Sequence, residues 1–536
     1  MSTNSASPNF LLLIADDLGK DLISITGSGT GRSMQVRTKA KDNTGPNANV
    51  IGYHVGNMPN VSRLLRNGVY FDQAWAQPAC SPTRASIYSG VHPWRNGVGS
   101  PMGNPVLDTT ISLTTLPELL PSAYKSGLFG KWHLGNNRDT SPLEHGWDKH
   151  VGTFDGVVPD YRQWPLLDSD GVYDEDLAPY STEYVTTVTI REAADWINAL
   201  DSDTPWFATM AFHAPHSPFH TPPSGTTGIT SIPAGANTDT NDFKFNLMTQ
   251  SLDHHIGGLL GTASSGGIPP MTEFDFAAIP QDQLQNTIII FIGDNGSDSR
   301  VAIEEPKTYE YEGSVAVPMI IADGASVMAE FNSTNDSPRF LHPRRVGWTS
   351  TGMTHVIDLY ATLAHFADPT DGTMPARTDS VDLGPLLTRP LMIRHKTPGK
   401  PKVPVNPGSG GLPGTKVPDL PDFEPAPTEV RNFNFAQWYS SDTERASIRN
   451  AEYKLNYEYD PATDSHTYAL YRFEEGIIPD REDATGTPAE NLWDAAINRT
   501  DNFARENLDL LLDELLADYR RNQNDQFHDP RPFPAA

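Results

Sequence analysis

Two continuous apolar runs in the chain each lead directly into a pair of oxygen-bearing side chains. The runs cover residues 10–15 and 287–292, and the pairs that follow are Asp16 with Asp17 and Asp294 with Asn295. Apolar runs of this length predict strands that are buried on both faces, as in a parallel sheet. Neighbouring strand residues point to opposite faces, so both members of a pair can serve one site only where the strand ends. Either pair alone is typical of a solvated turn, but two such strands can meet at the sheet edge where ligands bind.

Helical and strand periodicities alternate through the first 390 residues. They predict helices over 59–68, 116–120, 181–200, 245–260 and 354–366, and strands over 69–71, 206–212 and 315–321. The helix over 245–260 places Leu252, Ile256 and Leu259 on its buried face, and we expect Asp253 and His254 to be solvated. Residues 27–50 are polar and glycine-rich, which favours a loop. The pattern predicts an α/β fold with a large mixed, mostly parallel sheet between helices.

The chain of 536 residues is too long for a single hydrophobic core. We expect a catalytic domain over residues 1–390 and a Pro/Gly-rich linker or surface wrap over 391–428. The remainder, 429–536, is predicted to be a C-terminal α+β subdomain with an antiparallel sheet and a terminal helix over 507–520.

The composition excludes several classes of partner. A net charge of −28 argues against nucleic acid and disfavours long anionic polymers, although a local basic pocket can still bind a small anion. No apolar run approaches the ~20 residues of a membrane span, and residues 10–15 are too short for a signal peptide. The expected location is therefore the cytoplasm, unless the chain was trimmed from a secreted precursor. The oligomeric state cannot be predicted from the sequence.

The single cysteine, Cys80, lies in the stretch Cys80-Ser81-Pro82-Thr83-Arg84, with Gly90 six residues after the arginine. One thiol cannot form an internal disulfide, and a buried structural cysteine is the simplest alternative. Proline favours the first turn of a helix and glycine its end, so a helix is predicted from this stretch to Gly90. A position near the helix N-terminus and beside a guanidinium is expected to lower the pKa of the thiol.

Three further segments carry candidate chemistry. Gly130-Lys131-Trp132-His133-Leu134-Gly135 places Lys131 and His133 on one side of an extended segment. The second contains His213, His216 and His220 directly after a predicted strand. Its prolines prevent a helical i, i+4 zinc pair, which favours one catalytic histidine with structural neighbours. The third contains Lys307 ahead of Glu312-Gly313. The oxygen ligands at the two strand ends suit Ca²⁺ or Mg²⁺ better than a thiophilic metal.

Taken together, these motifs resemble those of the type I sulfatases. The shared features are Asp16-Asp17, Cys-x-Pro-x-Arg at 80–84, the hexapeptide at 130–135, Ala-Pro-His at 214–216, Asp294-Asn295-Gly296 and Lys307, in that order. The resemblance implies an alkaline-phosphatase-like fold and arylsulfatase-like hydrolysis of a sulfate ester. It also implies that a separate maturation enzyme converts Cys80 to formylglycine. Thr83, residues 314–318 and residues 18–21 depart from the family pattern, which leaves the substrate open among aryl, alkyl and sugar sulfates.

The resemblance also implies a role for each candidate residue. Hydration of the aldehyde at position 80 gives two hydroxyls; one attacks sulfur and expels the alcohol, and the other loses its proton so that sulfate leaves. The implied metal ligands are Asp16, Asp17, Asp294, Asn295 and an oxygen of residue 80, with Ca²⁺ expected and Mg²⁺ possible. Arg84 is expected to hold the metal environment and residue 80 in place. Lys131 and Lys307 are expected to face developing negative charge, and His133 is expected to handle the proton of the second hydroxyl. His216 is the expected general acid, and Lys307 with a lowered pKa is the alternative.

Two rival functions remain open at this stage. A phosphonate monoester or phosphodiester hydrolase could use the same formylglycine, because its substrate also needs cations around the transferred group. A non-catalytic protein that binds a metal or an anion could use the same scaffold, and an unmodified Cys80 in the native host would favour it.

Overall fold

The computed structural model describes most of the predicted catalytic region and parts of the C-terminal region. The described residues are 7–29, 32–36, 56–101, 105–107, 113–174, 176–226, 238–261, 276–302, 306–334, 336–369, 374–375, 378–389, 431–440, 443–472, 507–512 and 514–515. The predicted linker over 391–428 and both of its boundaries lie outside them, so the domain division stays a prediction.

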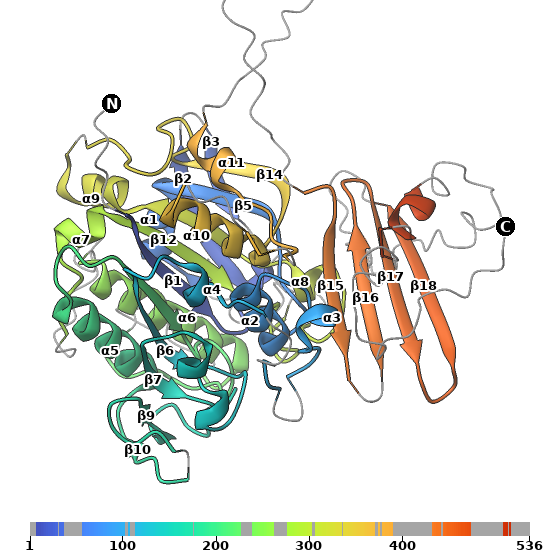
Figure 1. Ribbon diagram of the computed structural model, residues 1–536, viewed down its shortest axis with the longest axis horizontal. Coiled ribbons are helices and arrows are strands. Elements are labelled where there is room, and N and C mark those ends of the chain that lie inside the picture. Colours follow the sequence, from blue (N-terminus) through green and yellow to red (C-terminus); the bar gives the residue numbers. More distant parts are fainter. Residues whose placement is uncertain are drawn as a thin grey trace, which may run out of the picture.

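A nine-stranded sheet forms the centre of the molecule, in the order β14-β5-β13-β12-β1-β11-β6-β7-β9 (Figure 1). Its strands are β1 (Asn9–Ala15), β5 (Gly68–Trp75), β6 (Lys125–Lys131), β7 (Lys149–Thr153), β9 (Leu167–Asp168), β11 (Trp206–Ala211), β12 (Thr287–Gly293), β13 (Met319–Asp323) and β14 (Trp348–His355). β1 runs parallel to both neighbours, β11 and β12, whereas β13 is antiparallel to β12 and β5. The sheet is mixed and mostly parallel, which confirms the predicted fold class.

Helices cover both faces of this sheet. They are α1 (Pro59–Arg66), α2 (Cys80–Ser89), α3 (Pro93–Asn96), α4 (Leu116–Leu119), α5 (Val185–Ala199), α6 (Asn241–Leu259), α7 (Gln281–Gln285), α8 (Glu312–Val315), α9 (Gly324–Asn332), α10 (Leu359–Ala367) and α11 (Gly384–Thr388). Short 3₁₀ turns are η1 (Lys20–Leu22), η3 (Arg138–Thr140), η4 (Pro142–His145) and η5 (Val356–Asp358). Small pairings involve β2 (Ile23–Gly29) with β3 (Arg32–Val36) and β4 (Gly56–Asn57), and β8 (Trp164–Pro165) with β10 (Tyr180–Ser181).

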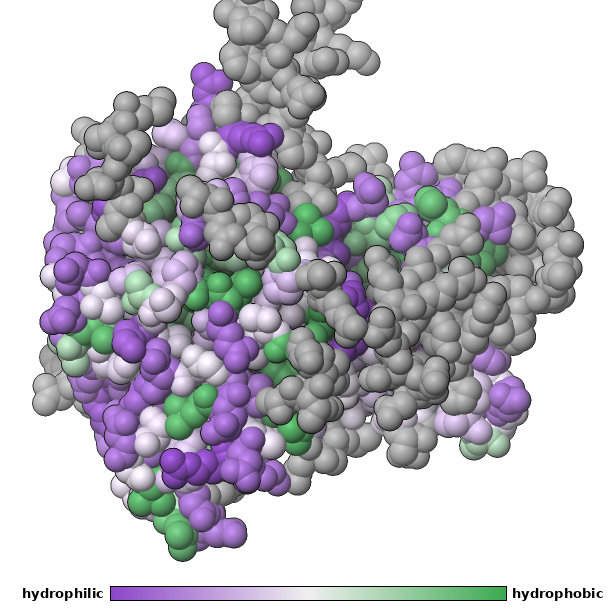
Figure 2. All heavy atoms as spheres, in the orientation of Figure 1, coloured by the Kyte–Doolittle hydropathy of each residue, from purple (hydrophilic) through white to green (hydrophobic). Residues whose placement is uncertain are grey.

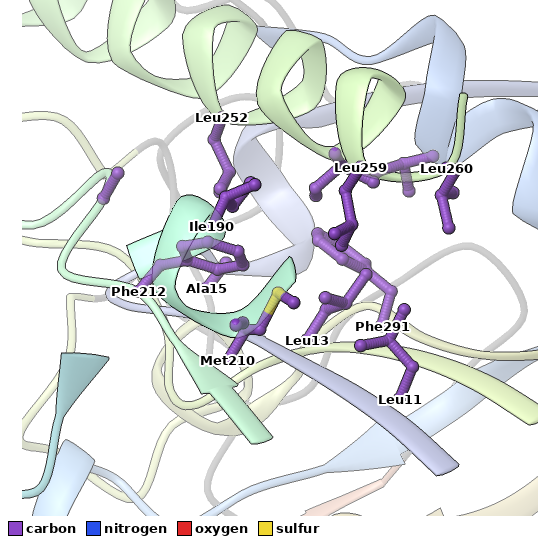
Figure 3. Close-up of a cluster of buried hydrophobic side chains, with 14 of the residues drawn as sticks. Leu11, Leu13, Ala15, Ile190, Met210, Phe212, Leu252, Leu259, Leu260 and Phe291 are labelled. Atoms are coloured by element: carbon purple, nitrogen blue, oxygen red, sulfur yellow. The ribbon is translucent and has the colours of Figure 1, made fainter. Parts of the chain in front are cut away.

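Alternate residues of β1 enter two different hydrophobic cores. Leu11 and Leu13 belong to the core shared with α5 and α6, whereas Leu12 and Ile14 belong to the core shared with α2 and α10. Figure 3 shows the first core, in which side chains of α5 and α6 lie over those of β1 and β12. Burial on both faces explains why the sequence of β1 is continuously apolar.

Several predicted elements differ from the structure. Asp253 and His254 are buried, not solvated, because α6 packs between other elements and the Asp253 carboxylate accepts the backbone N–H groups of Asn60 and Val61 at the start of α1. The segment predicted as a helix from residue 354 begins as strand β14, and α10 starts at Leu359. The strand predicted over 315–321 starts only at Met319, after helix α8. Residues 23–29 and 32–36 pair as strands where a loop is predicted from residue 27, and residues 37–50 lie outside the described part.

A four-stranded antiparallel sheet lies beside the central domain (orange in Figure 1), as predicted for the C-terminal region. Its strands are β15 (Asn434–Tyr439), β16 (Glu444–Arg449), β17 (Tyr453–Asp460) and β18 (Ser465–Arg472). Leu508, Leu511 and Leu515, from the described part of the predicted terminal helix, pack into the core of this sheet. Arg449 of β16 joins the sheet to α8 through an ion pair with Glu312, at 3.0 Å.

The surface in Figure 2 is mainly polar where it is described, and the apolar residues form separate patches. Among the described residues, no helix combines the length and the apolar character needed to cross a membrane.

Candidate active site

The two strand-end pairs meet at one edge of the central sheet. β1 and β12 are in register, with Ala15 opposite Gly293, so the residues that follow each strand lie side by side. The backbone N–H of Asp17 donates to Oδ1 of Asp294 at 3.0 Å, and Nδ2 of Asn295 donates to Oδ1 of Asp17 at 2.8 Å. All four side chains are fully buried. The register of two parallel strands therefore produces the predicted cluster.

Each of the three carboxylates is paired with one basic side chain. Lys131 Nζ lies 2.6 Å from Asp16, Lys307 Nζ lies 2.7 Å from Asp17, and Arg84 Nη2 lies 2.8 Å from Asp294. Nε of Arg84 also contacts Asp294, at 3.2 Å, and its Nη1 donates to the carbonyl of Lys131. These side chains come from β6, from α2 and from the segment before α8, so the site is assembled from five separate parts of the chain.

Burial and the basic side chains separate the pKa values of two carboxyls. Burial alone would raise the pKa of Asp16, but the Lys131 ammonium, with help from His216 and Arg84, holds it well below the ordinary value. Burial and the neighbouring Asp16 charge raise the pKa of Asp294 to about 7.

Two oxygen atoms of the cluster are suited to a cation. Oδ1 of Asp16 and Oδ1 of Asn295 are buried and make no hydrogen bond within the described residues. Ligand atoms of Asp16, Asp17 and His216 also lie within 4.8 Å of one another. Buried carboxylate and amide oxygens without donors fit a hard divalent ion. His216 was not predicted as a ligand, but it lies close enough to the two aspartates to be one.

Cys80 is the first residue of α2, which begins and ends as predicted, with Gly90 in the left-handed conformation after its last turn. The side chain is 4% exposed, and its Sγ lies 3.3 Å from Nδ1 of His133. Burial raises the pKa of the thiol despite the nearby Lys131, so the predicted lowering is wrong. The error arises because the sequence shows the helix start but not the loss of water around it.

His133 is held against Cys80 by its own backbone and by a glycine. Its φ is +61°, and its carbonyl accepts a hydrogen bond from Oγ of Ser81 at 2.9 Å. A Cβ on Gly156 would lie only 2.2 Å from Cε1 of the imidazole. Burial and the Lys131 charge keep the pKa of His133 well below its ordinary value. The imidazole is therefore neutral and can accept a proton.

His216 and Lys307 form the opposite side of the cluster. Nε2 of His216 lies 3.2 Å from Nζ of Lys307 and 3.5 Å from Asp17, and Nδ1 lies 2.7 Å from the carbonyl of Ser217. Burial alone would lower the pKa of Lys307, but the Asp17 carboxylate raises it instead, contrary to the predicted direction. Both candidates for general acid thus occupy the same wall of the site.

The other two histidines of the segment have different partners. Nε2 of His213 lies 3.0 Å from the hydroxyl of Thr153, and burial with the Lys131 charge lowers the His213 pKa to about 3. His220 contacts the Tyr184 hydroxyl at 3.2 Å. Of the three, only His216 has a ring nitrogen within hydrogen-bond distance of Lys307.

Tyr161 and Gly156 contribute to the site but were not found in the sequence. The buried Tyr161 hydroxyl lies 2.6 Å from the carbonyl of His213 and 2.7 Å from that of His216, so it fixes the turn between them. Gly156 provides the space for the His133 ring. Neither residue belongs to a motif; a glycine three residues after Thr153 was the only signal available for Gly156.

Comparisons with known proteins find similarity to sulfatases. A family model described as "Sulfatase" matches residues 8–263. N-acetylgalactosamine-6-sulfatase of Homo sapiens is 29% identical over 239 residues, and arylsulfatase J of Mus musculus is 29% identical over 186 residues. These matches cover 40% and 32% of this chain, and 40% and 31% of the respective relatives. The chain thus matches well under half the length of these curated relatives.

Solved structures extend the similarity to nearly the whole chain at the level of the fold. PsFucS1 sulfatase from Pseudoalteromonas sp. has a TM-score of 0.61 and 17% identity, and the match covers 97% of this chain and 92% of that one. BT4656, described in complex with its substrate D-glucosamine-2-N,6-O-disulfate, has a TM-score of 0.59 and 17% identity, with coverage of 97% and 100%.

Proposed function

We propose that the chain is a member of the sulfatase family and that it hydrolyses a sulfate monoester to an alcohol and inorganic sulfate. The observation that carries this proposal is the meeting of Cys80, His133 and the acid cluster in one buried site. Cβ of Cys80 is the carbon that would carry the aldehyde of formylglycine, and Nδ1 of His133 lies 3.3 Å from Sγ, the atom that an oxygen would replace. Lys131 and Lys307 provide the positive charge that a sulfuryl group needs.

Two groups complete the proposed chemistry. Formylglycine at position 80 supplies a hydrated aldehyde as nucleophile, and a divalent ion supplies Lewis acidity. Asp16, Asp17, Asp294 and Asn295 would hold this ion, which we propose to be Ca²⁺, with Mg²⁺ second, because all four of these side chains offer oxygen atoms. A separate maturation enzyme is the partner that would form the aldehyde.

The residues of the chain have distinct tasks in this proposal. Neutral His133 accepts a proton from the hydroxyl that remains on residue 80, and so allows sulfate to leave. His216 donates a proton to the leaving oxygen from the opposite wall. The two lysine ammonium groups orient the sulfuryl oxygens and stabilise the charge that develops on them. Loss of one such donor typically costs about 10²–10³ in rate.

We propose a sulfated saccharide of short length as the substrate. One similar protein is named N-acetylgalactosamine-6-sulfatase and another is described in complex with a disulfated glucosamine substrate, which supports a sugar. The net charge of −28 would repel a long polyanion. It would repel a short saccharide only weakly, because exposed charges are screened beyond about 8 Å at physiological salt.

The test uses protein produced with and without a formylglycine-generating enzyme. Peptide mass spectrometry across residue 80 should show the aldehyde only after co-expression, and only that protein should hydrolyse an aryl sulfate faster than phenylphosphonate or a phosphodiester. Cys80→Ala should abolish turnover. An active Cys80→Ala protein would overturn the mechanism, and preferred hydrolysis of phenylphosphonate would replace the sulfatase assignment with that rival.

The metal is tested separately by elemental analysis of protein purified without chelator. We expect about one hard divalent ion per chain, lost in Asp16→Ala. Stoichiometric zinc with neither calcium nor magnesium would contradict the assignment of oxygen ligands.

A further inference from the structure

Arg300 is an exposed arginine in the segment that follows Asp294 and Asn295. Its side chain is 49% exposed, yet its guanidinium is fixed. Nε and Nη2 donate to the two carboxylate oxygens of Asp298, at 2.7 and 2.9 Å, and the backbone N–H of Arg300 donates to the same carboxylate. An exposed arginine without such contacts would sample many rotamers, so a binding group would have to order it at an entropic cost.

One face of this guanidinium is also supported by an aromatic ring. Its Cζ lies 4.9 Å from the ring centroid of Phe219, and Phe219 in turn packs edge-on against Phe245 of α6, at 5.9 Å. Phe219 is anchored to the core beneath α6. A cation held over an aromatic ring is attracted by the negative face of the ring. The guanidinium is therefore oriented from two directions by different parts of the chain.

Both supports of Arg300 come from segments that also carry the proposed active site. Phe219 lies three residues after His216, and Asp298 lies three residues after Asn295. The carbonyl of Ser297, in the same segment, accepts the backbone N–H of Lys307 at 3.0 Å. Hydrogen bonding with Asp298 raises the pKa of Arg300, and the charges of Asp298 and Asp17 contribute.

Part of the guanidinium remains available. Nη1 makes no hydrogen bond within the described residues, whereas Nε and Nη2 are both used by Asp298. A planar guanidinium with a free edge, held in place and open to solvent, is suited to an oxyanion.

We propose that Arg300 binds a second anionic group of the substrate, a carboxylate or a further sulfate on the same or the adjoining sugar. The proposal rests on the proposed hydrolysis of a sulfated saccharide and specifies it further. Nη1 of Arg300 donates to the second oxyanion while the scissile sulfate lies between Lys131 and Lys307. Asp298 and Phe219 are positioning residues, because they fix the guanidinium and do not touch the substrate.

The experiment compares kcat/KM for matched saccharide pairs on the mature, formylglycine-containing enzyme. One substrate carries only the scissile sulfate; its two counterparts add a uronic carboxylate or a second sulfate, which distinguishes the two sources of charge. In Arg300→Gln, the preference for at least one doubly anionic substrate should fall by about tenfold, as expected for loss of a charged hydrogen bond. Arg300→Lys should restore part of the preference. Arg344→Gln, a change at an exposed arginine on another segment, should leave it at the wild-type value.

The outcomes separate this inference from the proposed function. If wild type hydrolyses all these sulfates and Arg300→Gln keeps the wild-type preference, the inference is wrong and the sulfatase assignment stands. If mature wild type hydrolyses none of them nor an aryl sulfate, the proposed function itself fails. Phe219→Leu removes the aromatic support but keeps the charge, so it should lower the preference less than Arg300→Gln; an equal or larger loss in the Phe219 variant would assign the recognition to the ring instead.

Discussion

The close approach of Gly156 to His133 allows a test of the proposed proton transfer that replaces no polar side chain. In Gly156→Ala, the new Cβ would lie 2.2 Å from Cε1 and 2.4 Å from both nitrogens of the imidazole. Ordinary contacts between such atoms are about 3.5–4.0 Å, so the ring must retreat by about 1.3 Å. Nδ1 of His133 is 3.3 Å from Sγ of Cys80, so a displacement of this size changes the position of the imidazole nitrogen relative to residue 80.

We expect Gly156→Ala to lower kcat by about 10², the cost that a displacement of about 1 Å can impose on a catalytic group. Because His133 acts after the sulfuryl group has been transferred, the first turnover should stay fast and the steady state should become slow. Rapid-quench measurements with an aryl sulfate should show a burst of alcohol, and intact mass should show sulfate retained on residue 80.

Gly384→Ala is the matched control, because its Cβ would also meet a histidine ring, Cδ2 of His365 at 2.5 Å. His365 is partly exposed and outside the site, so this variant should keep the wild-type kcat. A Gly156→Ala enzyme with wild-type steady-state turnover would refute the role of His133. Equal slowing of the burst and of the steady state would place His133 before sulfuryl transfer.

The remaining predictions concern the general acid, the junction between the sheets, and pH. His216→Ala should steepen the dependence of kcat/KM on leaving-group pKa more than Lys307→Ala does, and an unchanged slope in the His216 variant would move the acid role to Lys307. Arg449→Met should lower the free energy of unfolding by about 3 kcal/mol in denaturant titration, because the buried Glu312 carboxylate loses its nearer cation and is left with Lys454 at 3.8 Å. Burial lowers the pKa of His150 to about 4. As the pH falls, His150 therefore binds a proton near pH 6.5 in the unfolded chain but only near about pH 4 in the folded chain. Stability should therefore be full above pH 6.5 and lower by about 2 kcal/mol at pH 5, and a His150→Gln protein with the same pH dependence as wild type would contradict this.

The strand-end cluster was predictable because it depends on only two local signals and one general rule. Apolar runs identified β1 and β12, and the ends of parallel strands meet at one edge of a sheet. The structure adds the register, with Ala15 opposite Gly293, which lets Asp17 form hydrogen bonds with both Asp294 and Asn295. The sequence could not supply that register, because it depends on how both faces of the sheet are packed.

The errors concern residues whose surroundings come from distant parts of the chain. The helical period placed Asp253 on a solvated face. In the structure, backbone N–H groups in the first turn of α1, which begins at Pro59, donate to that carboxylate. A buried carboxylate is tolerated there because two backbone N–H groups of α1 need an acceptor. Partners separated by almost 200 positions leave no trace in a local pattern. For the same reason, the burial of Cys80 and the Asp17 charge beside Lys307 reversed two predicted pKa directions.

Three non-glycine residues at the site adopt the left-handed backbone conformation, and no motif predicted any of them. They are Asp17, His133 and Thr308, with φ values of +60°, +61° and +80°. Such conformations cost of order 1–3 kcal/mol each for side chains larger than glycine, although Asp and His tolerate them better than Thr. Each is held by contacts from elsewhere: Asp17 by Lys307, His133 by Ser81, and the Thr308 N–H by the carbonyl of Pro78.

These contacts connect the conformation of the site to the rest of the fold in a specific way. Thr308 follows Lys307 directly, and Pro78 lies two residues before Cys80, so one backbone hydrogen bond of 2.8 Å joins the lysine segment to the approach of the nucleophile helix. Ser81 joins that same helix to His133. Both walls of the site are thus positioned by hydrogen bonds to residues at, or just before, the start of α2. A substitution that shifts this helix start would displace His133 and Lys307 together, even if every catalytic side chain were retained.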